Sequence, residues 1–400
     1  MKHLLTTLIC LMLIAACGEN KSNKTPSRDG FLHVIDLDKT KGEIPLSKVF
    51  ASITPIALET TKNSLIGRVN RAIITDEYII VYDGAMANAL FLFKKDGSFL
   101  HKFGRIGNGP GEYSNIADFR YDSATGTIYM LDRQTGRVNL YDIHTGEFLK
   151  SIQLRNNRSS SQSIYYQDGV LYATSRYFTN ENGRYLLSSR NQTTGEIEET
   201  WFDAETYSKN IANTNRHPFL FGDSNSFKFN SFFMDGIMLF EKGKITPFLA
   251  FTSEYTLNMN DFKKLDGDLN NFKHEMIDQL KNFGKVFDIN SYFEHKDLIF
   301  MEFWLGQSYK TLLYNQKTKE SKYISLFDDM IYKKKDSNFS QDPPAFIGYD
   351  DNGLIAVKDA IGVKEILDKN LASAGFKSAA SELSDLERDA NPVLLYYEFK

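Results

Sequence analysis

Apolar and polar residues alternate along most of the chain in short runs, and tight-turn signals separate these runs at a constant spacing. Four such turns centre on Gly97, Gly146, Gly195 and Gly243, so successive turns are 49, 49 and 48 residues apart. Glycine turns flanked by alternating apolar residues are typical of β-hairpins. A constant period with short strands in every unit predicts a propeller or a related repeat array. Each turn follows an apolar strand, and these strands cover 89–93, 138–143, 185–189 and 236–240.

The second unit shows the expected blade most clearly, as four strands joined by short turns. The first unit repeats this order with RAIITD, EYIIVYD, ALFLFKK and SFLHKF. A later unit reads DLIFMEFWL, KTLLYNQ and SKYISLF, with its turn near Thr318. We expect the first strand of each unit to line the centre of the ring. The four strands of the second unit are 116–122, 126–132, 137–143 and 147–154.

Two helical insertions interrupt the repeat. Gly243 and Thr318 are 75 residues apart, about one helix more than the usual spacing. Apolar residues recur at steps of three and four over 262–283, which predicts an amphipathic helix that ends near Gly284. A second helical stretch is expected over 359–388. The remaining chain holds about six units, so the sequence predicts an all-β, six-bladed β-propeller with two helical insertions.

The ring needs a strand from elsewhere to complete its last blade. The chain ends on the strand PVLLYYEFK, and no turn or fourth strand follows it. An open edge strand invites aggregation, so a closing strand is expected. The run 53–60 lies directly before the first unit and is the first candidate, and 31–37 is the other. The sequence therefore predicts that an N-terminal strand closes the last blade.

The stretch FGRIGNGPGEYSNIADF, 103–119, holds four glycines and a proline and raises the question of a phosphate-binding loop. A dinucleotide loop needs Gly-x-Gly-x-x-Gly between a strand and a helix. Counted from Gly107, the third glycine falls on Glu112, and a strand pattern follows instead of a helix. We therefore interpret the stretch as a connector between blades, in which glycines supply positive φ angles and Pro110 stiffens one turn.

The segment from this connector to the next glycine turn closely resembles an NHL-type propeller repeat. Such repeats continue with a strand that ends in Asp, an Arg-Val pair and a turn glycine, and Asp132, Arg137-Val138 and Gly146 match these positions. Together with PIALETTKNSLIG and the N-terminal leader, the chain resembles the six-bladed β-propeller lipoproteins of Bacteroidetes. The good match spans about residues 50–155. This resemblance implies a fold and no established activity.

The first residues are expected to be a lipoprotein signal peptide, 1–16. A short apolar run ends in Ile-Ala-Ala-Cys, which resembles the bacterial lipobox, so Cys17 is the expected lipidation site. An ordinary secretory signal is the alternative, but it needs no cysteine at the cleavage site. Gly18 after the cysteine resembles the outer-membrane sorting pattern. We expect a flexible lipidated tether over 17–29 and a single propeller domain over 30–400.

Composition and charge exclude several classes of protein. The chain is 42% hydrophobic and 14% aromatic, which suits a large β-rich core. Its net charge of −4 argues against a nucleic-acid binder. The other cysteine, Cys10, lies in the leader, so neither a disulfide nor a reactive thiol is expected in the mature protein. The seven histidines lack zinc-ligand spacing, and DGDLNN lacks the glycine and the final acid of a calcium loop, so we expect no cofactor.

Two functions remain open. The first is a non-catalytic binding propeller held at the outer membrane by its lipid, monomeric, with an anionic glycan, peptide or envelope protein as partner. The second is a propeller enzyme, a lyase or hydrolase with a metal in the central channel. Asp118 is an inner-strand ligand candidate for that metal, but the equivalent strands offer Arg71 and Gln162.

Charged residues of the first three units allow two interpretations, an anion-binding side of the ring or solvated loops in which arginine outnumbers lysine. Arginines gather on the side of the blade-to-blade connectors, whereas acids gather on the opposite side. Arginine binds carboxylate, sulfate or phosphate through two hydrogen bonds, so we expect an anion site at the channel mouth, with tyrosines as stacking walls. An Arg105→Ala, Arg137→Ala double substitution is expected to abolish binding. The predicted ligand-binding residues are Arg105, Glu112, Tyr113, Arg133, Arg137, Arg158, Arg176 and Tyr177.

Overall fold

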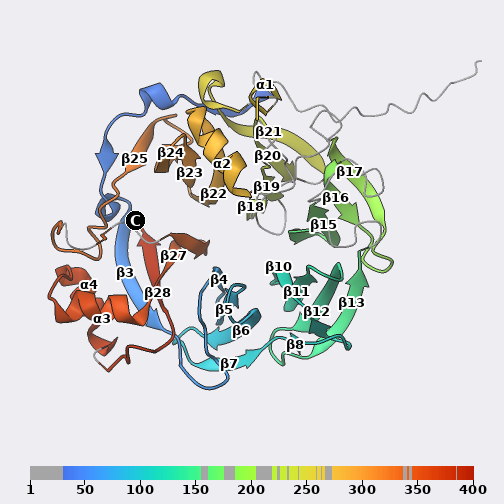
Figure 1. The fold of residues 1–400 in the computed structure, drawn as a ribbon, viewed down its shortest axis with the longest axis horizontal. Coiled ribbons are helices and arrows are strands. Elements are labelled where there is room, and N and C mark those ends of the chain that lie inside the picture. Colours follow the sequence, from blue (N-terminus) through green and yellow to red (C-terminus); the bar gives the residue numbers. More distant parts are fainter. Residues whose placement is uncertain are drawn as a thin grey trace, which may run out of the picture.

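The computed structural model confirms a six-bladed β-propeller, with the blades arranged as a ring (Figure 1). It describes residues 30–400 except 155–160, 175–184, 204–218, 223–225, 232–233, 242, 258, 263, 266–272, 337–339, 342–344 and 384.

The first three blades are four-stranded antiparallel sheets in sequence order, with the first strand innermost. Blade one has β4 (Arg71–Ile74), β5 (Tyr78–Asp83), β6 (Ala89–Lys94) and β7 (Phe99–Lys102). Blade two has β10 (Ile116–Asp122), β11 (Thr127–Asp132), β12 (Arg137–Asp142) and β13 (Phe148–Gln153). Blade three has β14 (Ile164–Gln167), β15 (Val170–Thr174), β16 (Tyr185–Arg190) and β17 (Ile197–Asp203). The connector before blade two carries a short parallel pair, β8 (Arg105–Ile106) and β9 (Glu112–Tyr113).

The last three blades each take a strand from the N-terminal segment. Blade four has β18 (Phe219–Gly222), β19 (Ser226–Phe229), β20 (Gly236–Glu241) and β21 (Lys244–Phe251), and β1 (His33–Ile35) adds to it. Blade five has β22 (Val286–His295), β23 (Leu298–Leu305), β24 (Ser308–Asn315) and β25 (Ser321–Ile324), with β2 (Glu43–Ile44). Blade six has β26 (Phe346–Tyr349), β27 (Gly353–Lys358), β28 (Val393–Phe399) and β3 (Phe50–Ala57).

The expected closure of the ring is confirmed. Strand β3 pairs antiparallel with β28 as the outer strand of blade six, and it begins three residues before the predicted run 53–60. The other candidate, 31–37, adds β1 to blade four in parallel and is not the closing strand. At the inner edge, a Cβ on Gly348 would lie 1.9 Å from the carbonyl oxygen of Ala72, so glycine allows blades six and one to approach closely.

Helices occupy the two expected insertions, α1 (Met259–Phe262) and α2 (Lys273–Asn282) in the first, α3 (Ala360–Asp368) and α4 (Ala374–Ala379) in the second. The prediction of one unbroken helix over 262–283 is wrong, because Lys264 and Leu265 are not helical. The backbone N–H of Lys264 donates to Asp261 in a tight turn, and the Asp261 carboxylate pairs with Lys285 at 2.7 Å. This ion pair fixes the end of α1 to the start of blade five, which apolar spacing alone does not reveal.

The hydrophobic core lies between neighbouring blades. Ile79, Ile80 and Val81 in β5 are all fully buried, because the blade is covered on both faces. One cluster joins blades one and two, and another joins blades six and one. A continuous apolar run in a middle strand therefore indicates that neighbouring blades cover both faces of that strand.

Candidate functional site

Buried aspartates at the ends of the second strands organise the loops on the connector side of blades one and two. Asp83 is fully buried, and its Oδ2 accepts hydrogen bonds from the backbone of Gly67 and Arg68 at 2.8 and 3.1 Å. Its Oδ1 accepts from Ala85 and Met86 at 3.1 and 2.8 Å. One carboxylate therefore joins the loop before blade one to the turn between its second and third strands.

Asp132 has the same position in blade two and the same role. It is fully buried and accepts hydrogen bonds from Ser114 N at 3.1 Å, Gln134 N at 3.0 Å and Thr135 Oγ1 at 2.9 Å. The aspartate that matches the repeat motif in the sequence is thus a structural organiser of loops and not a ligand-binding group.

These loops present three arginines, Arg68, Arg133 and Arg137. Arg68 and Arg133 are exposed and Arg137 is half-buried. Within the described chain, none of the three forms an ion pair, and Nε of Arg137 donates only to the hydroxyl of Thr135 at 3.4 Å. We call the loops 65–68, 84–87 and 133–137 the basic loop surface. It carries three positive charges, and its loops contain no acidic residue.

The basic loop surface is continuous across blades one and two. The side-chain amide of Asn88 donates to the carbonyl of Ser114 at 3.1 Å and accepts from Ile116 N at 3.0 Å. The carbonyl of Asn115, the residue after Ser114, accepts a hydrogen bond from Arg133 N at 2.7 Å. The turn of blade one is therefore tied through the connector to the turn that carries Arg133.

Arg105 and Glu112 form an ion pair of their own, with Nε and Oε1 2.6 Å apart. Hydrogen bonds from the backbone N–H of Gly109 and from the Arg105 guanidinium lower the pKa of the Glu112 carboxyl below its usual range. Both residues belong to the β8–β9 pair, which lies at the rim of the ring near β13 (Figure 1). The structure therefore places Arg105 away from the channel mouth where the sequence predicted it, because the connector folds outward over blade two.

Tyr113 does not form the exposed stacking wall expected from the sequence. Its side chain is only 2% exposed and packs in the cluster between blades one and two. Burial raises the pKa of its hydroxyl well above the usual range. The other expected site residues, Arg158, Arg176 and Tyr177, lie outside the described residues.

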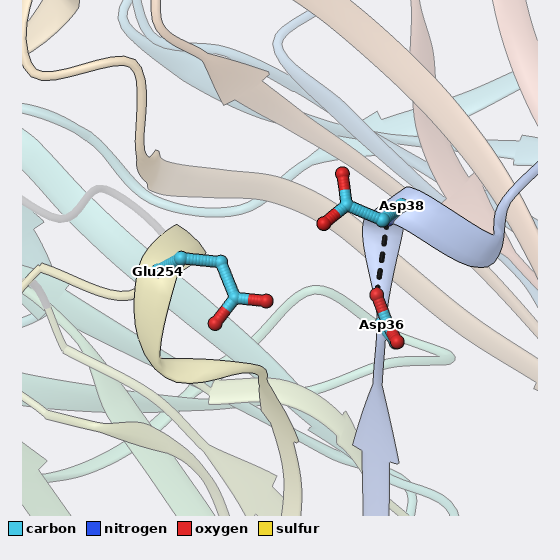
Figure 2. Close-up of side chains that lie close together, drawn as sticks. All are labelled: Asp36, Asp38 and Glu254. Carbon is cyan, nitrogen blue, oxygen red and sulfur yellow. Dashed lines mark hydrogen bonds between the residues drawn. The ribbon is translucent and has the colours of Figure 1, made fainter.

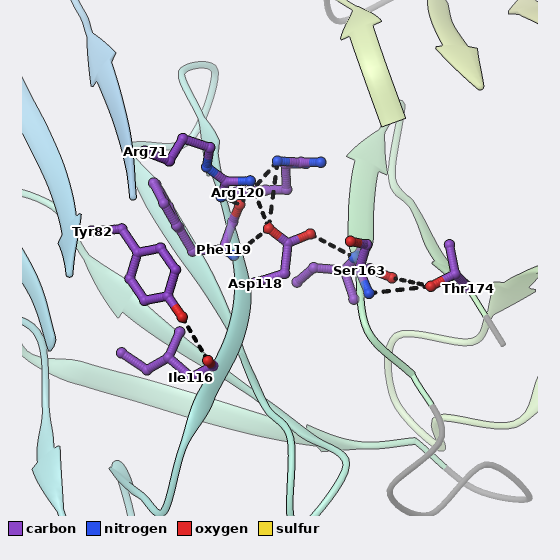
Figure 3. Close-up of polar contacts among 9 residues, drawn as sticks. Arg71, Tyr82, Ile116, Asp118, Phe119, Arg120, Ser163 and Thr174 are labelled. Atoms are coloured by element: carbon purple, nitrogen blue, oxygen red, sulfur yellow. Dashed lines mark hydrogen bonds and ion pairs between the residues drawn. The ribbon is translucent and has the colours of Figure 1, made fainter. Parts of the chain in front are cut away.

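A charged cluster lies at the inner strand of blade two (Figure 3). Nη1 of Arg71 lies 2.6 Å from Oδ1 of Asp118, and Nη2 of Arg71 donates to the carbonyl of Phe119. Oδ2 of Asp118 accepts from Ile164 N at 2.9 Å, and Arg120 lies 3.6 Å from Oδ1. This cluster therefore joins the inner strands of blades one, two and three.

The surroundings of Asp118 do not suit a metal ion. Both carboxylate oxygens already accept hydrogen bonds, and the guanidinium of Arg71 is held against them. Burial lowers the pKa of Arg71 to about 10, while the charge of Asp118 opposes that shift. A group that is paired with a buried cation is a structural anchor, so Asp118 offers no support for the channel metal of the enzyme hypothesis.

Three carboxylates from the N-terminal segment and the turn after β21 lie within 4.8 Å of one another, those of Asp36, Asp38 and Glu254 (Figure 2). Oδ1 of Asp36 accepts from Asp38 N at 3.1 Å, and Lys39 pairs with Asp36 at 2.9 Å. The Tyr255 hydroxyl donates to Oδ1 of Asp38 at 2.6 Å. The Ser253 hydroxyl donates to Oε2 of Glu254 at 3.3 Å. Local partners therefore account for all three groups, and we assign no ion to this exposed cluster.

Glu302 in β23 is a buried carboxylate in blade five. Burial raises its pKa to about 7, although hydrogen bonds from Ser291 and Tyr309 act in the opposite direction. The folded protein thus holds a proton that the unfolded chain releases near pH 4.5.

This shift predicts how stability depends on pH. Below about pH 4.5 the group is neutral in both states. Between about pH 4.5 and 7 the unfolded chain ionises while the folded state keeps its proton, so the stability falls by up to about 3 kcal/mol, and this loss is complete above pH 7. We expect Glu302→Gln to stabilise the protein above pH 7 by up to that amount and to have little effect near pH 4.5. Urea unfolding at both pH values checks this result. Glu320→Gln, an exposed substitution on the same blade, is the control, and equal effects of the two variants would contradict the account.

The ring of blades and the loops on its connector side define a six-bladed β-propeller with an exposed basic surface. The chain belongs to the family described as a domain of unknown function, DUF4934, whose model matches residues 32–398. No curated protein matches the sequence. None of the helices in the described part of the chain is long and apolar enough to cross a membrane.

One solved structure supports the fold, and a second is reported for comparison. A Bacteroides fragilis protein, described as a "Putative exported protein", is 19% identical with a TM-score of 0.73, over 92% of this chain and 99% of its own. A member of the DUF4221 family from Bacteroides vulgatus is 11% identical with a TM-score of 0.49, over 88% of this chain and 97% of its own. The resemblance to NHL-type repeats stays a prediction.

Proposed function

We propose that this protein is a non-catalytic binding propeller, held at the outer membrane by a lipid on Cys17, whose basic loop surface binds an anionic partner. The observation that carries this proposal is the set of Arg68, Arg133 and Arg137, which share one side of blades one and two and form no ion pair within the described chain. Buried aspartates hold the loops in place, so little ordering entropy is lost on binding.

The opposite side of the same blades is acidic, which favours binding of an anionic partner at the basic loop surface only. Its turns carry Asp76, Glu77 and Asp122, and burial followed by the negative charge of these acids raises the pKa of Tyr121. An anionic partner is therefore repelled from one side of the ring and attracted to the other, which favours encounter at the basic loop surface.

The proposed tether leaves this surface free. The described chain begins at Gly30, next to β1 on blade four. Blade four lies three blades from blade one, across the ring from the basic loop surface (Figure 1). A lipid anchor that enters at blade four leaves blades one and two on the far side of the ring, where they are accessible to a partner outside the membrane.

Binding to a defined polyanion tests the proposal. We expect the purified propeller to bind polygalacturonate or polyglutamate at 50 mM salt and to lose about tenfold in affinity at 300 mM, because exposed charges are screened. The Arg133→Ala, Arg137→Ala variant should lose about tenfold at low salt as well. Fluorescence anisotropy with labelled probes measures both effects.

Two matched variants serve as controls. Arg105 is already neutralised by Glu112, and Lys95 lies on a turn of the opposite side, so Arg105→Ala and Lys95→Ala should each change the affinity less than twofold. Affinity that depends neither on salt nor on Arg133 and Arg137 would rule out the proposed site.

The lipid anchor has a separate test. Cys17→Ser should move the protein from the membrane fraction to the soluble fraction, with an unchanged melting temperature, because residues 17–29 are proposed as a tether. Fractionation at high salt followed by thermal unfolding checks both parts. A variant that stays with the membrane would show that another anchor exists.

A further inference from the structure

Two exposed apolar side chains lie within the basic loop surface. Met86 is 75% exposed and Leu65 is 56% exposed. Single exposed apolar residues are common on protein surfaces, so exposure alone decides nothing. These two differ because Leu65 belongs to the loop that presents Arg68, and Met86 belongs to the turn that Asp83 ties to that loop.

The packing of the two loops brings Met86 next to the backbone that carries Arg68. A Cβ placed on Gly67 would lie 2.6 Å from Cβ of Met86, so only glycine permits this approach. The carboxylate of Asp83 binds the backbone N–H of both Arg68 and Met86, at 3.1 and 2.8 Å. The cationic and the apolar side chain therefore leave adjacent, fixed points of the backbone.

This arrangement selects among anionic partners. Acidic polysaccharides carry carboxylates or sulfates but no aliphatic side chains, whereas an acidic peptide carries both carboxylates and apolar groups. Methionine is flexible and polarizable and adapts to irregular apolar groups, and both methionine and arginine are enriched at protein interfaces. The charge of Arg68 next to Met86, with Arg133 on the turn of the neighbouring blade, fits carboxylates that accompany an apolar residue.

We propose that the partner is an acidic protein segment whose apolar side chain packs on Met86 and Leu65 while its carboxylates bind Arg68 and Arg133. This inference rests on the proposed function and narrows it from anions in general to peptides. The segment lies across the connector side of blades one and two, from the loop 65–68 to the turn 133–137.

Three labelled probes test the inference with the purified full propeller. They are a blocked ten-residue peptide of eight glutamates and two leucines, the same peptide with serines in place of the leucines, and polygalacturonate. We expect the leucine peptide to bind about tenfold more tightly than the serine peptide. Met86→Ser should abolish this difference and leave the affinity for polygalacturonate unchanged.

Leu149→Ser is the matched control, since Leu149 is 53% exposed on β13 at the rim, and it should leave all three affinities unchanged. Met86 is exposed, so its substitution should not change the melting temperature, which is measured in parallel. The inference is overturned if the two peptides bind equally, or if Met86→Ser leaves the affinity for the leucine peptide unchanged. In either case the proposed function still holds if binding depends on Arg133. If none of the three probes binds, the inference and the proposed function both fail.

Discussion

Deletion of residues 53–60 is expected to leave the protein insoluble or without fixed tertiary packing. The deletion removes most of β3, which pairs with β28 from Ala57 and Val393 to Phe50 and Phe399. The side chain of Ile53 is buried, and burying such a side chain contributes about 1.5–3 kcal/mol. The buried Asn391 also loses its bonds to Thr60 and Glu59. These losses together approach the usual stability of a domain, about 5–15 kcal/mol.

Removal of a strand that does not close the ring gives the comparison. Deletion of residues 31–37 takes β1 from blade four, which keeps its own four strands. We expect a soluble propeller with a lower melting temperature from this second deletion. Solubility, near-UV circular dichroism and thermal unfolding measure both variants. A 53–60 deletion that folds and melts like the full chain would show that β3 does not close the ring.

Asp118→Asn is expected to destabilise the protein by about 3–5 kcal/mol, the usual cost of breaking one side of a buried ion pair. Only 5% of the Asp118 side chain and 14% of the Arg71 side chain are exposed. The substitution keeps the shape of the side chain but leaves the buried guanidinium of Arg71 without its carboxylate. Urea unfolding at neutral pH measures the loss.

A double-mutant cycle separates this ion pair from simple packing. Replacement of both partners, as Arg71→Met with Asp118→Asn, should recover much of the stability, because the buried guanidinium of Arg71 is then no longer left without its carboxylate. Arg105→Ala, which breaks a pair whose arginine is 82% exposed, should cost less than about 1 kcal/mol. If Asp118→Asn lowers the free energy of unfolding as little as Arg105→Ala does, the charged cluster of Arg71 and Asp118 does not join the blades.

The order of the first four blades was predictable from the sequence because each of them ends in a hairpin with its own glycine. Gly97, Gly146 and Gly195 all have positive φ, between 71° and 89°, so only a residue tolerant of that conformation fits the turn. The closing strand was predictable because the last strand has no turn after it. The parallel additions of β1 and β2 were not, since a parallel strand needs no hairpin and leaves no turn signal.

The site was only partly predictable for a related reason. Arg133 and Arg137 could be proposed from the sequence because they lie on a short turn inside one repeat. Arg68 and Met86 could not, because their proximity depends on hydrogen bonds to Asp83 between two separate loops. A signal existed, since both the first and the second unit end their second strand in Asp, at Asp83 and Asp132. The pairing of Arg105 with Glu112 depends on the path of the connector, which the glycine pattern alone does not specify.

Capture of a partner from the native envelope tests the central claim most directly, namely that the basic loop surface binds an anionic partner. The tethered full-length protein and its Arg133→Ala, Arg137→Ala variant are purified side by side from mildly solubilised envelopes at 50 and 300 mM salt. We predict an acidic partner that is retained by the unsubstituted protein at low salt, released at high salt, and absent from the variant at both. A partner captured equally by both proteins at both salt concentrations would contradict the claim.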